Sequence, residues 1–83
     1  MVRPEFERVL KEVGEERGVT RAQLLAPTRS SPEIAAARQE AMRRVHKAAP
    51  TASWSFIGRL FGRDRTTVRH ACRKSDVHTA TPI

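Results

Sequence analysis

Side chains that could bind an anionic partner are concentrated near the C-terminus of this 83-residue sequence. They carry guanidinium, imidazole and hydroxyl groups, and they belong to Arg65, Thr66, Thr67, Arg69, His70 and Arg73. On a helix, Val68, Ala71 and Cys72 would share the opposite, apolar face, so the polar side chains would point outward. Such a helix fits the major groove of duplex DNA, where arginine can form two hydrogen bonds with guanine and a threonine methyl can pack on a thymine methyl.

This helix needs a partner helix and a tight turn to hold it. Ser53 is the predicted N-cap of a helix over about residues 54–61. A second helix is expected from residue 64 or 65 to about residue 74, with the carboxylate of Asp64 as its predicted cap. Gly58 would allow the two helices to cross closely, and Gly62 would tolerate a positive φ in the turn. The pattern predicts a helix-turn-helix. On the glycine spacing alone, an ordinary helical hairpin with a solvated face remains the alternative.

Three further helices are expected upstream of this motif. Apolar residues at helical spacing predict a first helix over about residues 4–17. Its buried stripe would consist of Phe6, Val9, Leu10 and Val13. Thr20 and Gln23 predict a capping box at the start of a short second helix. Ser31 predicts the N-cap of a long third helix that ends before the loop at residues 49–52.

The third helix has two distinct faces. Its buried face is predicted to contain Ile34, Ala37, Ala41, Met42, Val45 and Ala48. Its exposed face is predicted to contain Arg38, Gln39, Arg43, Arg44 and Lys47. The expected fold is therefore all-α, a small bundle of about five helices with a C-terminal helix-turn-helix. We expect one domain over residues 1–76 and a flexible tail over residues 77–83.

The basic residues are unevenly distributed. The net charge is +7, yet residues 1–26 are neutral overall and residues 38–74 carry ten basic residues against two acidic ones. This split is typical of a protein in which one part contacts phosphates and the other does not. It favours a nucleic acid as the partner over an anionic membrane surface, and the alternative is that the charge serves only solubility.

Other classes of function have little support. The single cysteine, Cys72, can form no internal disulfide, so a reducing cytoplasm is the expected compartment. Cys72 itself is expected to be a small buried apolar residue. No signal peptide or membrane-length apolar run is visible. His46, His70 and His78 are too scattered for a metal site, and no catalytic cluster is present. We expect no enzyme activity, no metal and no cofactor.

Two segments resemble a known family. The run from Ile57 to Lys74 reads I-G-R-L-F-G-R-D-R-T-T-V-R-H-A-C-R-K, and an upstream match reads A-R-Q-x-A-M over residues 37–42, preceded by Arg29-Ser30. Together they resemble the C-terminal DNA-binding domain of the bacterial replication initiator DnaA. The resemblance covers residues 18–74. No G-x-x-x-x-G-K-[ST] loop occurs, so no ATP site of that kind is expected.

The resemblance implies roles for individual positions. It implies that Asp64, Arg65, Thr66 and Thr67 face bases in the major groove. It places Arg38, Gln39, Arg63 and His70 at or near the DNA backbone and groove edge. It also implies that Arg29 and Ser30 belong to a basic loop that reaches the minor groove.

This sequence departs from the family pattern at three points. The turn has one glycine fewer, Arg65 replaces the histidine of D-H-T-T, and Ser30 stands where the family has the minor-groove arginine. All three are specificity positions rather than core positions. We therefore expect the fold to be kept and the recognised DNA site to differ from the family's usual box.

Two functions from different classes follow. The first is a stand-alone bacterial or phage regulator of transcription or replication, cytoplasmic and associated with the nucleoid. The second is an adaptor that binds replication or transcription machinery through the first helix and Trp54. Trp54 and Phe56 cannot both face inward, so one covers the edge of the core or forms a partner-binding spot. An adaptor has no reason to keep Arg65, Thr66 and Arg69 exposed on the last helix.

Overall fold

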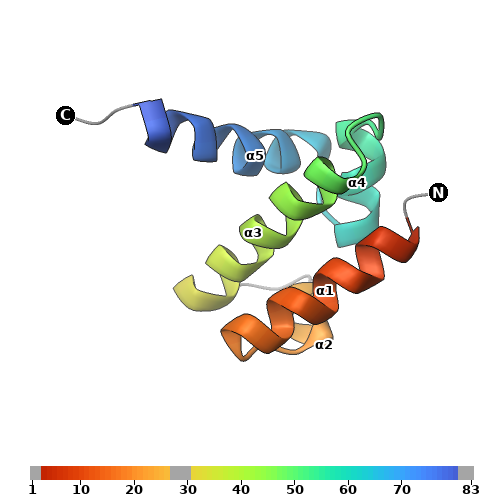
Figure 1. Cartoon of the computed structure of the whole chain (residues 1–83), viewed down its shortest axis with the longest axis vertical. Coiled ribbons are helices and arrows are strands. Elements are labelled where there is room, and N and C mark those ends of the chain that lie inside the picture. The colour runs from red at the N-terminus through yellow and green to blue at the C-terminus, as the bar shows by residue number, and fades with distance from the viewer. Residues whose placement is uncertain (1–2, 27–30, 81–83) are drawn as a thin grey trace.

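A computed structural model shows an all-helical fold over the residues it describes, 3–26 and 31–80, with side chains described up to residue 73. Five helices and no strand make up this part of the chain: α1 (Arg3–Arg17), α2 (Arg21–Leu24), α3 (Pro32–Ala48), α4 (Trp54–Phe61) and α5 (Arg65–Ala80). α3 lies between α1 and α5, and α4 packs beside the start of α5 (Figure 1). The predicted all-α class is confirmed.

The predicted N-caps hold the starts of three helices. The Thr20 hydroxyl accepts the backbone N–H of Gln23 at 3.0 Å, and the Gln23 side chain accepts the Thr20 N–H at 2.8 Å, which completes the predicted capping box. The hydroxyls of Ser31 and Ser53 each accept the N–H three residues on, at 3.3 and 3.0 Å. These bonds satisfy amides that have no partner within the helix. Local sequence therefore sets where α2, α3 and α4 begin.

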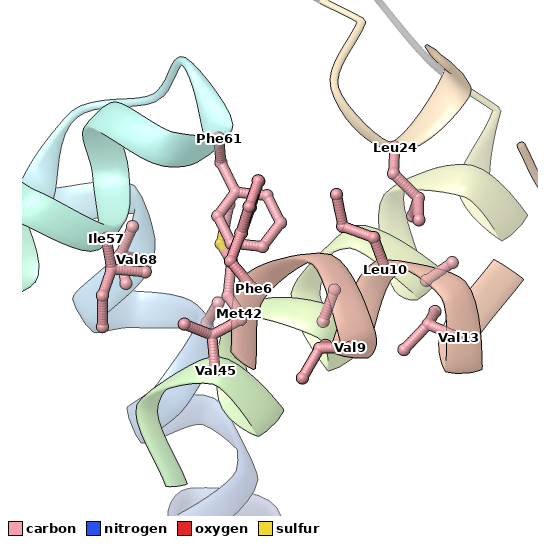
Figure 2. Close-up of a cluster of buried hydrophobic side chains, with 13 residues drawn as sticks. Phe6, Val9, Leu10, Val13, Leu24, Met42, Val45, Ile57, Phe61 and Val68 are labelled. Carbon is pink, nitrogen blue, oxygen red and sulfur yellow. The ribbon is translucent and has the colours of Figure 1, made fainter. Parts of the chain in front are cut away.

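One hydrophobic core joins all five helices. The rings of Phe6 and Phe61 meet edge to face with their centroids 5.2 Å apart (Figure 2). Aliphatic side chains fill the rest of the core: Val9, Leu10, Val13, Leu24, Ala37, Ala41, Met42, Val45, Ile57, Val68 and Ala71. The predicted stripe of α1 is confirmed. On α3 the ends of the predicted stripe differ, since Ile34 is half-buried and Ala48 is exposed.

The last helix is longer than the sequence pattern predicts. We expected it to end near Lys74, whereas α5 continues to Ala80. Residues 77–80, expected to belong to a flexible tail, are therefore helical, and residues 81–83 lie outside the described part. The sequence after Gly62 contains no glycine, and Pro82 is its first proline. Because neither strong helix breaker intervenes, loss of the apolar pattern alone does not end the helix.

Candidate nucleic-acid interface

The turn between α4 and α5 depends on two glycines. Gly62 has a φ of 69°, the left-handed conformation that glycine adopts without strain. Gly58 lies so close to the turn that a Cβ atom there would be 2.5 Å from the carbonyl oxygen of Arg63. The Arg63 N–H donates to the Gly58 carbonyl at 2.8 Å. Both predicted glycine roles are confirmed, and together they fix the direction in which α5 leaves α4.

Asp64 caps the start of α5. Its carboxylate accepts the backbone N–H of Thr67 at 2.8 Å. This hydrogen bond, with a smaller one from the Thr67 hydroxyl, lowers the pKa of Asp64 below its usual value. The predicted cap is confirmed, and it keeps a negative charge at the N-terminus of the helix, where the helix dipole favours one.

The first turns of α5 present a polar face to solvent. The side chains on this face are exposed, and they belong to Arg65, Thr66, Thr67, Arg69, His70 and Arg73. Val68 and Ala71 are buried on the opposite face, and Cys72 is half-buried with its Sγ 3.9 Å from the Met42 carbonyl oxygen. The helix therefore brings together on one exposed face the donor-rich set that the sequence predicts, and the major groove of DNA is wide enough to admit an α-helix.

Arg38 does not lie on the exposed face of α3, contrary to our expectation. Its side chain is only 7% exposed, and its Nε and Nη2 atoms donate to the carbonyl oxygens of Leu24 and Gln23 at 2.8 and 3.1 Å. Burial, with a smaller contribution from nearby Arg63, lowers the pKa of Arg38. The long side chain turns toward α2 because the end of that short helix offers carbonyls that need donors.

Arg63 reaches the same part of the chain from the helix-turn-helix. Its Nη2 atom donates to the Ala26 carbonyl oxygen at 2.8 Å. Two arginines, one from α3 and one from the α4–α5 turn, thus hold the chain segment at the end of α2. Arg29 and Ser30, the predicted minor-groove residues, lie just beyond this segment and outside the described residues.

The remaining basic residues of α3 are partly occupied by internal contacts. Arg43 donates to the Ala71 carbonyl oxygen of α5 at 3.1 Å and pairs with Glu40 at 2.7 Å. Arg44 pairs with Glu16 of α1 at 2.6 Å and with Glu40 at 2.8 Å. These arginines and Gln39 are half-buried rather than fully exposed, whereas Lys47 is exposed as expected. The pair between Arg44 and Glu16 links α1 to α3, and the hydrogen bond of Arg43 links α3 to α5.

The comparison with known proteins agrees with this geometry. Residues 6–74 match the family model described as the bacterial dnaA protein helix-turn-helix. The chain belongs to this family. Neither a curated protein nor a solved structure matches the chain. Membership of the DnaA helix-turn-helix family supports DNA as the partner, and the exposed face of α5 is the surface that the family motif predicts for it.

Sequence reasoning missed one feature next to the DnaA motif. Trp54, at the first position of α4, is half-buried and packs against the core, as one of our two alternatives expected. It also lines a hollow with Arg65, Thr66 and Arg69 of α5. Phe56 points away from the core and is 43% exposed. The sequence did not indicate this hollow, because Trp54 and Arg65 lie on different helices. They line the same hollow only because the turn brings α4 and α5 together.

Among the side chains that the structure describes, in residues 3–26 and 31–73, no cluster of three or more histidine, cysteine or acidic groups could hold a metal ion. None of the helices within residues 3–26 and 31–80 is both long and apolar enough to cross a bilayer.

Proposed function

We propose that this protein is a sequence-specific double-stranded DNA-binding regulator of bacterial or phage transcription or replication, acting in the cytoplasm at the nucleoid. The observation that carries the proposal is the exposed polar face of α5, which begins at a capped, glycine-fixed turn. A helix held in this way can enter the major groove with its N-terminal residues nearest the base edges. Family membership supports the same partner.

Each group on this face has a matching partner on DNA. Arg65 can form two hydrogen bonds with guanine, and Thr66 and Thr67 can pack on thymine methyls or bond to base edges. Asp64 is held ionised by its hydrogen bonds to Thr67, so its carboxylate can accept from a cytosine amino group. Arg69 and Arg73, together with His70, are expected to contact phosphates.

Other predicted contacts belong to residues outside α5. Gln39 and the pair Arg29-Ser30 remain predictions that the family resemblance implies, and Arg43 remains a prediction from the concentration of basic residues. For Arg38 and Arg63 we propose a positioning role instead, because their guanidinium groups hold the carbonyls of residues 23, 24 and 26. In that role they would set the path of the chain that leads into the basic loop.

The adaptor alternative has weaker support. It relied on α1 and Trp54 as a docking surface for replication or transcription machinery. The apolar stripe of α1 is buried in the core, which leaves a mixed-charge exposed face, and Trp54 packs against the same core. Neither element offers the large exposed apolar patch that a protein-docking site usually has.

Selection from a random pool of duplex DNA tests the proposal. We expect an enriched motif of a few base pairs and an affinity that falls steeply with salt, because phosphate contacts release counterions. Arg69→Ala should weaken binding to every duplex, whereas Arg17→Ala, which removes the same charge from exposed α1, should not. Binding without enrichment would remove sequence specificity from the proposal. No binding at low salt would overturn it.

A further inference from the structure

A hollow lies where the start of α4 meets the exposed face of α5. It is lined by Trp54 from α4 and by Arg65, Thr66 and Arg69 from the first turns of α5. The indole is half-buried, whereas the two arginines and the threonine are exposed. An apolar ring therefore borders the surface that we assign to DNA, next to two cationic groups.

The indole is held in place from behind. The imidazole of His46, near the end of α3, lies against it with the ring centroids 4.5 Å apart and the planes inclined by 36°. Trp54 also packs against the hydrophobic core. Because His46 and the core already restrict the indole, it loses little conformational entropy when a ligand contacts its remaining surface.

The chemistry of the hollow matches one part of a nucleic acid. The guanidinium group of Arg69 suits the negative charge of a phosphate, and the adjacent aromatic ring suits an apolar surface such as the C–H face of deoxyribose. A bare anion would not use the ring, and an apolar ligand would not use the arginines. One phosphate–deoxyribose unit of a DNA strand uses both.

Resting on the proposed DNA binding, we infer that Trp54 is a further DNA-contacting residue. A strand bordering the major groove lies in the hollow, with its phosphate near Arg69 and a deoxyribose against the indole. Arg65 remains free to reach a base edge beyond it. Trp54 thereby sets how deeply α5 sits in the groove, and His46 positions Trp54.

The wild-type protein provides the first test, because Trp54 is its only tryptophan. Binding of a labelled duplex is followed by the anisotropy of the label, which does not depend on the indole. At saturating duplex we expect the fluorescence of Trp54 to change and its quenching by acrylamide to fall clearly. Unchanged quenching in a fully bound complex would overturn the inference and leave DNA binding intact.

Variants provide the second test. Trp54→Ala should weaken duplex binding about tenfold, comparable to losing the burial of part of an aromatic ring. Trp54→Phe, which keeps an apolar ring against the core, should bind with intermediate affinity and an unchanged salt dependence. Phe56→Ala is the matched control, since Phe56 is exposed on the same helix but does not line the hollow.

The outcomes separate the two claims. Equal affinities for Trp54→Phe, Phe56→Ala and the wild type would overturn the role of Trp54. Protection of the indole by poly-glutamate but not by DNA would assign the hollow to an acidic protein segment instead. Absence of any duplex binding by the wild type would overturn the proposed function itself. Circular dichroism melting verifies that each variant is folded.

Discussion

Arg65 is exposed at the first position of α5, where the DnaA motif has histidine. A guanidinium is longer than an imidazole, permanently charged and able to bond guanine at two points. We expect Arg65→Ala to weaken the free energy of binding by about 1–3 kcal/mol on the selected site and by little on random DNA. Anisotropy titrations with selected and scrambled duplexes measure both values.

A conservative variant sharpens this prediction. Arg65→His should shift the base preference partly toward the family's usual box, because the shortened turn and Ser30 stay unchanged. Equal losses on selected and scrambled DNA for Arg65→Ala would identify Arg65 as a phosphate contact instead.

Arg38 is expected to act on the fold rather than on phosphates. Arg38→Ala leaves the carbonyls of Leu24 and Gln23 without their charged donor, which should lower the free energy of unfolding by about 1.5–3 kcal/mol. Urea denaturation measures this loss. The slope of log K against log salt should stay unchanged, whereas Arg69→Ala should flatten it by about one unit. A flatter slope for Arg38→Ala would show that Arg38 contacts a phosphate after all.

Single residues also mark the limit of sequence reasoning at this scale. The exposure of Arg65, Thr66 and Arg69 was predictable from their polarity. The apolar residues Val68 and Ala71 lie on the opposite face of the helix and are buried. Arg38 was misplaced because a guanidinium can turn toward either side of a helix. Its direction depends on carbonyls at the end of α2, and their proximity is a tertiary fact.

Gly58 ties α4 to the turn that follows it. In Gly58→Ala the new methyl would meet the carbonyl oxygen of Arg63 at 2.5 Å, and backbone must move to make room. Overpacking of this kind costs about 1–3 kcal/mol, so we expect a lower melting temperature and weaker DNA binding. Ser55→Ala, exposed on the same helix, is the control. A Gly58→Ala variant as stable as the wild type would contradict the close crossing.

Asp64 makes the start of α5 sensitive to acid. Its pKa is lowered in the folded state, chiefly by the Thr67 N–H, so its stabilising contribution is full above the unfolded pKa. That contribution is lost as the pH falls through the lower, folded pKa. Asp64→Asn can still cap the helix but carries no titratable charge, so the stability difference between wild type and variant should shrink below about pH 4. Urea denaturation at pH 7 and pH 3 measures it.

Element boundaries were predictable where a local signal exists. The hydroxyls of Thr20, Ser31 and Ser53 and the left-handed Gly62 are short-range features, and each lies where expected. The end of α5 has no such signal before Pro82, so the pattern underestimated its length.

At the scale of the whole molecule, charge is divided between two sides of α3. α1, with neutral overall charge over residues 1–26, lies across α3 from α5 (Figure 1). Arg44 bridges part of this distance by pairing with Glu16 and Glu40, and both partners raise the pKa of Arg44. The orientation places the balanced side of the molecule away from the proposed DNA surface.

The variant Arg44→Gln tests how much the ion pairs of Arg44 contribute to the stability of the fold. Because the ion pairs are partly exposed, we expect the variant to lose less than about 1 kcal/mol of the free energy of unfolding at low salt. The loss should diminish in high salt, since screening weakens the pairs of the wild type. Thermal melts at two salt concentrations measure it, with Lys47→Gln, exposed on the same helix, as the control. A loss independent of salt would point to packing of the side chain instead of charge.

The position of α3 has a consequence for how the chain folds. It contacts each of the other four helices, so neither the pair α1–α2 nor the pair α4–α5 has a complete core of its own. We therefore expect that the helix-turn-helix does not fold as an autonomous peptide and that the five helices unfold as one cooperative unit. Most contacts join residues fewer than 12 positions apart in the sequence, a pattern of low contact order that favours folding in microseconds to milliseconds.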